Sequence, residues 1–99
     1  MLFDALADGN RRRILDLLLE RERPVHDLVG ALRVSQPAVS KHLRVLREAG
    51  LVTSRVDAQR RLYRLRAEPL HQLDDWLAPY RATWGSRLDA LESHLEEMT

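Results

Sequence analysis

The spacing of apolar residues changes twice along this 99-residue chain, and this constrains its fold more than any other feature. Up to Gly50, apolar residues recur every three or four positions, which is the spacing of amphipathic helices. Between 52 and 65 they alternate with polar residues, as in a two-stranded hairpin, and the helical spacing returns from Pro69 onward. The predicted fold class is therefore mainly α with a small β-hairpin. Before Gly50 we expect a short first helix with Leu2, Phe3 and Leu6, and longer helices near 10–21, 24–33 and 36–49.

Cysteine is absent, and no apolar run approaches the ~18 residues that a membrane-spanning helix needs. The sequence therefore excludes disulfides, thiolate metal sites, cysteine nucleophiles and thiol redox switches. The first residues lack the basic and apolar regions of a signal peptide, so we expect a cytoplasmic protein with no membrane contact. Residues 1–99 suit a single domain, and a core this small would gain stability from pairing with a second copy.

Charge is strongly segregated along the chain, although the formal net charge is only +1. Residues 1–32 carry five arginines and six acids, for a net charge of −1. Residues 33–66 carry nine Lys or Arg and two acids (+7), and residues 67–99 carry two arginines and seven acids (−5). A positive block in an otherwise balanced domain is typical of a surface that binds nucleic acid. The alternative is a solvated basic surface without a ligand.

The two segments on either side of residues 32–35 form a helix-turn-helix pattern. Ser35 is a suitable N-cap for the second helix, and Gly50 is a suitable end. Opposite the apolar stripe of this helix lie amide, hydroxyl, ammonium and guanidinium groups, which contact base edges and phosphates in DNA. We therefore predict that 36–49 is a recognition helix. The residues expected to bind DNA are Ser35, Gln36, Pro37, Ser40, Lys41 and Arg44.

The hairpin at 52–66 is rich in arginine, and Asp57 is its only acid. Such a hairpin suits a wing that lies along the sugar-phosphate backbone and positions the domain without selecting a base sequence. Alternation along the second strand directs Tyr63 and Leu65 toward the core, which leaves Leu62 unexplained. The wing residues expected to contact DNA are Arg55, Arg60, Arg61 and Arg64.

From Leu70 onward, apolar residues follow each other at alternating spacings of three and four, which form a seam along one long helix. Pro79 must kink or split this helix. The seam could cover its own domain or pair with a second copy, and we prefer pairing because its aromatic residues and long leucine row exceed what a domain of this size needs internally. The expected dimerisation residues are Leu2, Phe3, Leu6, Leu77, Tyr80, Trp84, Leu88, Leu91 and Leu95.

Several stretches resemble the ArsR/SmtB family of winged helix-turn-helix regulators. They are ALAD at 5–8 with RRRIL at 11–15, SQPAVSKHL at 35–43 and LREAGLV at 46–52. The resemblance covers nearly all of the chain and is most specific from Ser35 to Val52. It implies a homodimer built from the first and last helices, a pseudo-palindromic operator and, in most members, repression that an inducer releases. The last thirty residues, with WLAPY at 76–80 and Trp84 ahead of a leucine-rich helix, resemble the family branch that has no metal sites.

The sequence departs from the metal-sensing members of that family. Their paired cysteines at the start of the third helix have no counterpart in 23–28, and the ligand spacing of the family's other metal site is not reproduced around Asp89 and His94. We therefore expect no metal and no cofactor. A non-standard metal site in a dimer stays open, because some histidines have an acid three or four positions away. These pairs are His71 with Asp74 or Asp75, and His94 with Glu97.

Nothing in the sequence supplies a nucleophile with an adjacent base and an oxyanion donor, so enzyme activity is not expected. The preferred interpretation is a homodimeric transcriptional regulator, a repressor, that binds double-stranded DNA with one recognition helix per half-site. The alternative is a winged-helix module that binds a protein through its acidic last helix and has no specific operator. Sequence-specific and strongly salt-dependent DNA binding would distinguish the two. The sequence identifies neither the operator nor a small-molecule effector.

Overall fold

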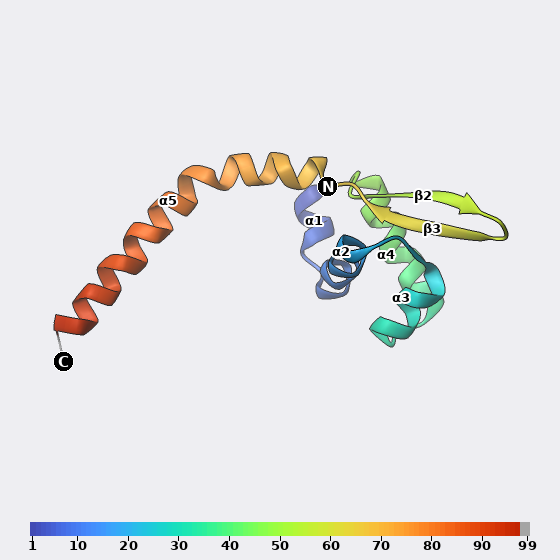
Figure 1. Ribbon diagram of the computed structural model, residues 1–99, viewed down its shortest axis with the longest axis horizontal. Coiled ribbons are helices and arrows are strands. Elements are labelled where there is room, and N and C mark those ends of the chain that lie inside the picture. The colour runs from blue at the N-terminus through green and yellow to red at the C-terminus, as the bar shows by residue number, and fades with distance from the viewer. Residues whose placement is uncertain (98–99) are drawn as a thin grey trace. The chain divides into compact units, whose positions relative to one another are not determined.

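The computed structural model describes residues 1–97 and divides the chain into two compact units, Met1–Pro69 and a second unit from Leu70 onward. The predicted class, mainly α with a small sheet, is confirmed (Figure 1). The four predicted helices of the first unit are all present, and the ends of the three with predicted bounds differ by at most one residue. One domain over 1–99 stays a prediction. The elements are α1 (Leu2–Leu6), α2 (Gly9–Glu20), β1 (Arg23–Pro24), α3 (Val25–Leu32), α4 (Gln36–Glu48), β2 (Val52–Asp57), β3 (Arg60–Leu65) and α5 (Glu68–Glu97).

Side chains cap the two longest helices of the first unit. The Asp8 carboxylate accepts hydrogen bonds from the backbone N–H groups of Asn10 at 2.8 Å and Arg11 at 3.1 Å at the start of α2. The bond from Arg11 is the main reason why the pKa of Asp8 lies below its usual value. At the start of α4, Ser35 Oγ accepts a bond from the Ala38 N–H at 3.3 Å, as expected of an N-cap.

The sheet has three strands in the order β1-β3-β2, whereas the sequence predicts only the two strands of the hairpin. The additional strand, β1, pairs antiparallel with β3 through Arg23 opposite Tyr63 and Pro24 opposite Leu62. A strand of two residues has no detectable period, and its proline is tolerated because β1 lies at an edge of the sheet.

Leu62, which the sequence leaves unexplained, belongs to the core, and Leu65, which is expected to point there, pairs with the buried Val52 and so shares its face. Leu62 is 7% exposed, while Tyr63 and Leu65 are partly exposed. The burial of Leu62 cannot be predicted from the hairpin alone. In the structure β1 lies next to β3 at Leu62, and α2 and α3 also contact β3.

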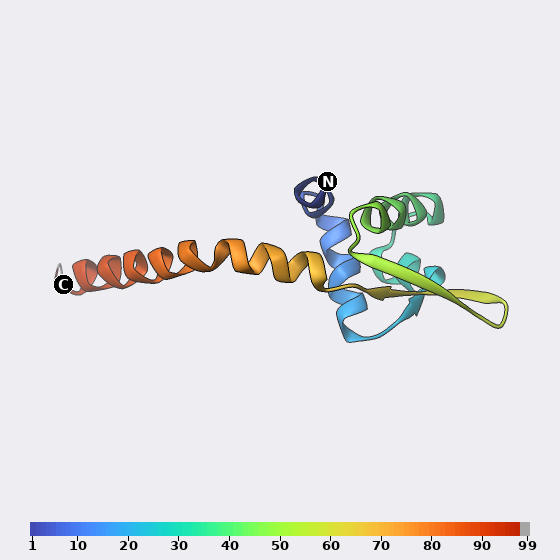
Figure 2. The same cartoon turned by 90° about the horizontal axis from the view of Figure 1, so that it is seen from above.

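The apolar core of the first unit is built from all of its helices and from the base of the hairpin. In both views the β2–β3 hairpin extends beyond the helices of this unit, which is the shape expected of a wing (Figures 1 and 2). The buried apolar residues are Ala5, Ile14, Leu15, Leu18, Leu28, Leu32, Val39, Leu43, Leu46, Leu51, Val52 and Leu62.

Helix α5 runs through Pro79 without a break, and Figure 1 shows that it bends partway along its length. A proline inside a helix removes one backbone hydrogen bond and favours a bend of this kind. The predicted kink is therefore observed, and the predicted alternative of a split helix is not. Among residues 1–97, no helix is both long enough and apolar enough to cross a membrane.

Candidate nucleic-acid interface

Helix α4 buries one face and exposes a polar one. Val39, Leu43 and Leu46 are at most 2% exposed and anchor the helix on the core. This packing turns the opposite face outward, so the polar side chains need no rearrangement to reach a ligand. The residues predicted from the sequence to contact DNA from this helix are all exposed: Ser35, Gln36, Pro37, Ser40, Lys41 and Arg44.

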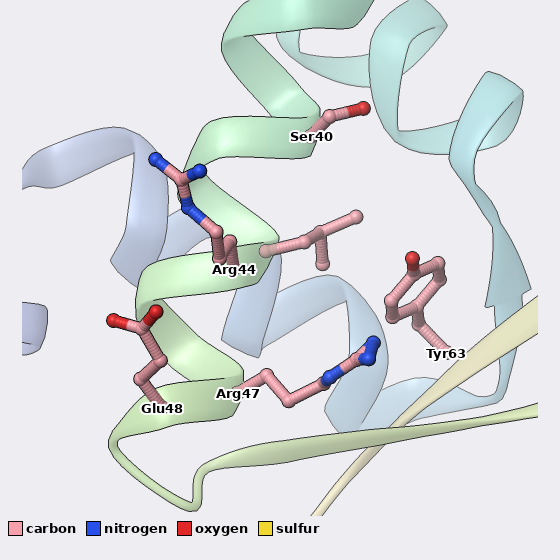
Figure 3. Close-up of a pocket in the computed structure, with 6 residues that line it drawn as sticks. Ser40, Arg44, Arg47, Glu48 and Tyr63 are labelled. Carbon is pink, nitrogen blue, oxygen red and sulfur yellow. The ribbon is translucent and has the colours of Figure 1, made fainter.

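A hollow of about 600 Å³ lies between α4 and the sheet, and sequence reasoning missed two of its residues, Arg47 and Tyr63, as possible DNA contacts. In Figure 3, the Arg47 side chain extends from α4 toward Tyr63 of β3, whereas Arg44 points away from Tyr63. A signal for Arg47 was present, because it lies three positions after Arg44 and therefore on the same side of the helix. The hollow is lined by Ser40, Leu43, Arg44, Arg47, Glu48 and Tyr63.

The four wing arginines project from two different faces of the hairpin. The β2–β3 register places Arg55 opposite Leu62, and paired residues share a face of the sheet. Residues two positions from Leu62 along β3 lie on this face as well, which adds Arg60 and Arg64. Arg61 lies on the other face, together with Tyr63 of the hollow. The wing therefore brings Arg61, and not all four arginines, to the side of the recognition helix.

The arginines on the Leu62 face have acids nearby. The Arg55 guanidinium donates two hydrogen bonds to Glu22, from Nε at 2.9 Å and from NH2 at 3.1 Å. Arg60 lies 3.8 Å from the Asp57 carboxylate. Asp57 is the only acid of the hairpin itself, but Glu22 also opposes the wing arginines, from the connection between α2 and β1, which is distant in sequence.

Ionisation of Glu22 and Arg55 reflects this contact. The hydrogen bond from Arg55 lowers the pKa of Glu22, and the positive charge of Arg64 lowers it further. The same contact raises the pKa of Arg55. Both side chains are therefore charged at neutral pH, and Arg64 lies close enough for its charge to act on Glu22.

Three consecutive arginines of α2, within the stretch that resembles the family, bind backbone carbonyls. Arg11 donates from Nε to the Ala5 carbonyl at 2.8 Å and from NH2 to the Asp4 carbonyl at 2.9 Å. Arg12 donates to the Leu6 carbonyl at 2.7 Å. These bonds tie the C-terminal end of α1 to α2, so these positive charges support the fold. The third, Arg13, donates to the Ala31 carbonyl of α3 at 3.1 Å.

The histidines lie in separate places. Nδ1 of His42 is 3.4 Å from NH1 of Arg11, and His26 pairs with the adjacent Asp27 at 3.3 Å. His71 lies 3.4 Å from Asp75 on α5, and both side chains are largely exposed. Within the part of the chain that the structure describes, no three His, Cys, Asp or Glu side chains gather into a possible metal site. The side chain of Asp89, considered in the sequence analysis, lies outside the described residues.

The residues predicted for dimerisation are exposed or partly exposed. Five of the six predicted residues on α5, from Tyr80 onward, have exposed fractions between 48% for Tyr80 and 65% for Leu88, and Phe3 of α1 is 63% exposed. Leu2, Leu6 and Leu77 are partly exposed. Trp76, which was not in the predicted set, is 56% exposed, and its ring centroid lies 5.1 Å from that of Tyr80.

A helix-turn-helix on a small sheet, with a projecting arginine-bearing hairpin beside an exposed polar helix, defines the winged-helix class of regulator. Residues 8–54 match the sequence model described as bacterial regulatory protein, arsR family. The arsenic resistance transcriptional regulator ArsR1 of Pseudomonas putida is 38% identical over 92 residues, which cover 80% of this chain and 71% of ArsR1. The chain therefore belongs to the arsR family, whose members are regulatory proteins and not enzymes.

Two further comparisons agree with this assignment. The transcriptional repressor SmtB of Mycobacterium tuberculosis is 48% identical over 64 residues. These cover 65% of this chain and 47% of SmtB, so the chain spans about half the length of that relative. The solved structure of an ArsR-like transcriptional regulator from Rhodococcus sp. RHA1 superposes with a TM-score of 0.76 at 33% identity, over 99% of this chain and 90% of that one.

Proposed function

We propose that this chain is a DNA-binding transcriptional repressor that acts as a homodimer on a pseudo-palindromic operator. The observation that carries the proposal is the exposed polar face of α4 beside a projecting hairpin, both within the segment of net charge +7. An α-helix of this kind fits the major groove, and clustered cations supply the salt-dependent attraction to phosphates.

Different residues of this surface have different roles in the proposal. Gln36 and Arg44 have the groups that form bidentate contacts with adenine and guanine edges, and Lys41 can bind guanine or a phosphate. The start of α4 suits a phosphate oxygen because the positive end of the helix dipole lies there and the Ser35 hydroxyl can donate its proton. The hollow adds Arg47 as a phosphate ligand. From the wing, Arg61 projects on the side of the hollow and is the arginine best placed to contact the backbone.

The homodimer is proposed from the exposed apolar side chains of α1 and α5. A second copy would bury them, and two-fold symmetry would place one recognition helix on each half-site, about 34–36 Å apart along the DNA. Repression is proposed because the relative SmtB is named a repressor. A bound dimer would then exclude the transcription machinery from the operator.

The test begins with the DNA fragments that the purified protein enriches from its own genome. A labelled duplex with the enriched sequence is titrated and followed by anisotropy at several salt concentrations, with a scrambled duplex as the control. We expect preference for a palindrome and a steep fall in affinity with salt. A reporter gene downstream of this palindrome should be less active when the protein is present.

Equal and weak binding to both duplexes would contradict the proposed function. It would favour the alternative module that binds a protein through α5, because that alternative requires no operator. Increased reporter activity would instead retain DNA binding and contradict repression alone.

A further inference from the structure

The contact between Glu22 and Arg55 joins two parts of the first unit that are far apart in sequence. Glu22 lies in the connection from α2 to β1, and Arg55 lies in β2. The two hydrogen bonds, at 2.9 and 3.1 Å, use both carboxylate oxygens and two guanidinium nitrogens. This fork geometry fixes the direction of the Arg55 side chain better than a single contact does. The Glu22 side chain is 33% exposed, so it is partly shielded from water.

The contact lies where the hairpin leaves the body of the unit. Pro24 of β1 pairs with Leu62, and Leu62 pairs with Arg55, so the strands β1, β3 and β2 are side by side at this level. From Leu62 toward the turn, only β2 and β3 remain paired. Val56, the next residue of β2, is 67% exposed. An isolated two-stranded ribbon is flexible in twist, so contacts at its base determine where its tip lies.

We infer that Glu22 is a positioning residue for the wing: by holding Arg55 it fixes the direction in which the hairpin leaves the body, and Arg55 itself makes no contact with DNA. The expected effect on DNA affinity rests on the proposed function, because it assumes that a correctly directed wing brings Arg61 to the DNA backbone. This inference replaces the role expected for Arg55 from the sequence. A free arginine on a wing suits a phosphate, but this one already has a carboxylate in bidentate geometry.

The competing interpretation predicts an opposite effect. If Arg55 were a phosphate ligand that Glu22 occupies in the free protein, Glu22→Gln would release it. Affinity for DNA would then rise, and the salt dependence would steepen by about one phosphate contact. If Glu22 positions the wing, Glu22→Gln lowers the affinity and leaves the salt dependence unchanged.

Loss of an acid also reduces general repulsion of DNA, so the experiment needs a matched control. Asp57→Asn removes one acid from the same face of the hairpin, and its contact with Arg60 lies within the hairpin, 3.8 Å apart. We expect Glu22→Gln to bind the operator about threefold more weakly than Asp57→Asn, because exposed ion pairs contribute modestly even in good geometry. Equal affinities, or tighter binding by Glu22→Gln, would overturn the inference.

Swapping the charges of Glu22 and Arg55 tests whether Arg55 helps to position the wing or contacts DNA directly. The swap Glu22→Arg with Arg55→Glu keeps the net charge and restores the pair. Because Arg64 acts on Glu22 and would repel an arginine there, the swap is made in Arg64→Gln and compared with Arg64→Gln alone. A positioning role predicts affinity within about twofold of that reference and an equal salt slope. An affinity as low as that of Arg55→Glu alone in the same background would show that Arg55 contacts DNA.

A measurement without DNA distinguishes failure of this inference from failure of the proposed function. Amide hydrogen exchange of residues 56–61 in the free protein should be faster in Glu22→Gln than in wild type and in Asp57→Asn, while exchange in the α4 core should be unchanged. Unchanged exchange in the hairpin would overturn the inference, whatever the DNA result. If the wild-type protein binds no operator but hairpin exchange is faster in Glu22→Gln as expected, the proposed function is contradicted and the positioning role is retained.

Discussion

The two units of the chain differ in whether they bury their apolar side chains. Met1–Pro69 buries twelve apolar residues in one core, whereas no described side chain of α5 from Leu70 to Glu97 is buried. Yet α5 carries two tryptophans and a row of leucines that are half exposed or more. A helix in water gains most of its stability from packing of an apolar face. The comparison therefore separates a unit that is stable through its own core from a helix whose apolar face is available to a second copy.

The largest effect is expected from the core of the first unit. Leu46 of α4 is 0% exposed, and Leu46→Ala should lower the free energy of unfolding by about 3 kcal/mol, because it removes buried methyl groups and leaves a cavity. Urea denaturation measures this change. The control Leu19→Ala, at a position of α2 that is 73% exposed, should change stability by less than about 0.5 kcal/mol. Equal losses of unfolding free energy in the two variants would contradict the assignment of Leu46 to the core and of Leu19 to the surface.

This contrast between the units also explains what the sequence could predict. Helices with a regular apolar stripe, such as α4, were predicted almost to the residue, because period and cap residues are both local signals. The burial of Leu62 was not, since it depends on the pairing of Pro24 with Leu62. A strand of two residues adds no pattern of its own, and its partner lies far along the chain.

On α4, the exposed polar face can be predicted from the sequence, because Val39, Leu43 and Leu46 form the buried stripe, whereas the ion pair that holds Arg55 on the wing cannot. The alternation of side chains along the hairpin can be recognised in the sequence, but the acid that binds Arg55 cannot. Glu22 is 33 residues away from it and has no motif that links the two. Long-range ion pairs depend on how the connections fold back on the sheet, and composition alone cannot supply that. Arg47 is a different case, because its helical spacing from Arg44 was sufficient to include it.

The second prediction tests the proposed role of α5. Leu91 is 53% exposed, and Leu91→Asp would place a charge in the proposed dimer contact. We expect dimerisation to weaken by about 2 kcal/mol, or about 30-fold in Kd, in sedimentation equilibrium. The control Ser93→Asp adds the same charge about 200° around the helix and should leave the dimer intact. Wild-type protein that is already monomeric at micromolar concentration would contradict the dimer.

The third prediction concerns the surface that only the first unit provides. Arg44→Ala should weaken operator binding by about 1.5 kcal/mol and relax the preference at one base position, because a bidentate contact with a base is lost. Arg61→Ala should weaken binding to all sequences alike and reduce the salt slope by about one. Anisotropy titrations with single-base variants of the operator distinguish the two patterns.

A matched control comes from the second unit, where Arg87→Ala removes one positive charge on exposed α5. It should change neither the base preference nor the salt slope beyond the error of the titration. An Arg61 variant with an unchanged slope would remove Arg61 from the DNA surface. It would then leave the recognition helix as the main source of phosphate contacts.

The smallest effect is expected at the cap of α2, which supports the first unit without joining its core. Asp8→Ala removes the acceptor for the N–H groups of Asn10 and Arg11 and should cost about 1 kcal/mol of unfolding free energy at neutral pH. Asp8→Asn keeps a capping oxygen but loses the charge, so its cost should be about 0.5 kcal/mol. Thermal or urea denaturation of both variants beside wild type measures these values.

The pH dependence of this cap has a definite sign. Since the pKa of Asp8 is lower in the folded protein than in the unfolded chain, the carboxylate stabilises the fold above the unfolded pKa, and this contribution is lost as the pH falls through the folded pKa. The stability difference between wild type and Asp8→Asn should therefore be constant from about pH 7 to about pH 5 and shrink below that. A difference that grew on acidification would mean that protonated Asp8 is the stabilising form, in conflict with the two N–H groups that donate to it. Because α2 holds the end of α1 through Arg11 and Arg12, a weakened cap should also loosen α1, which amide exchange of residues 4–7 would detect.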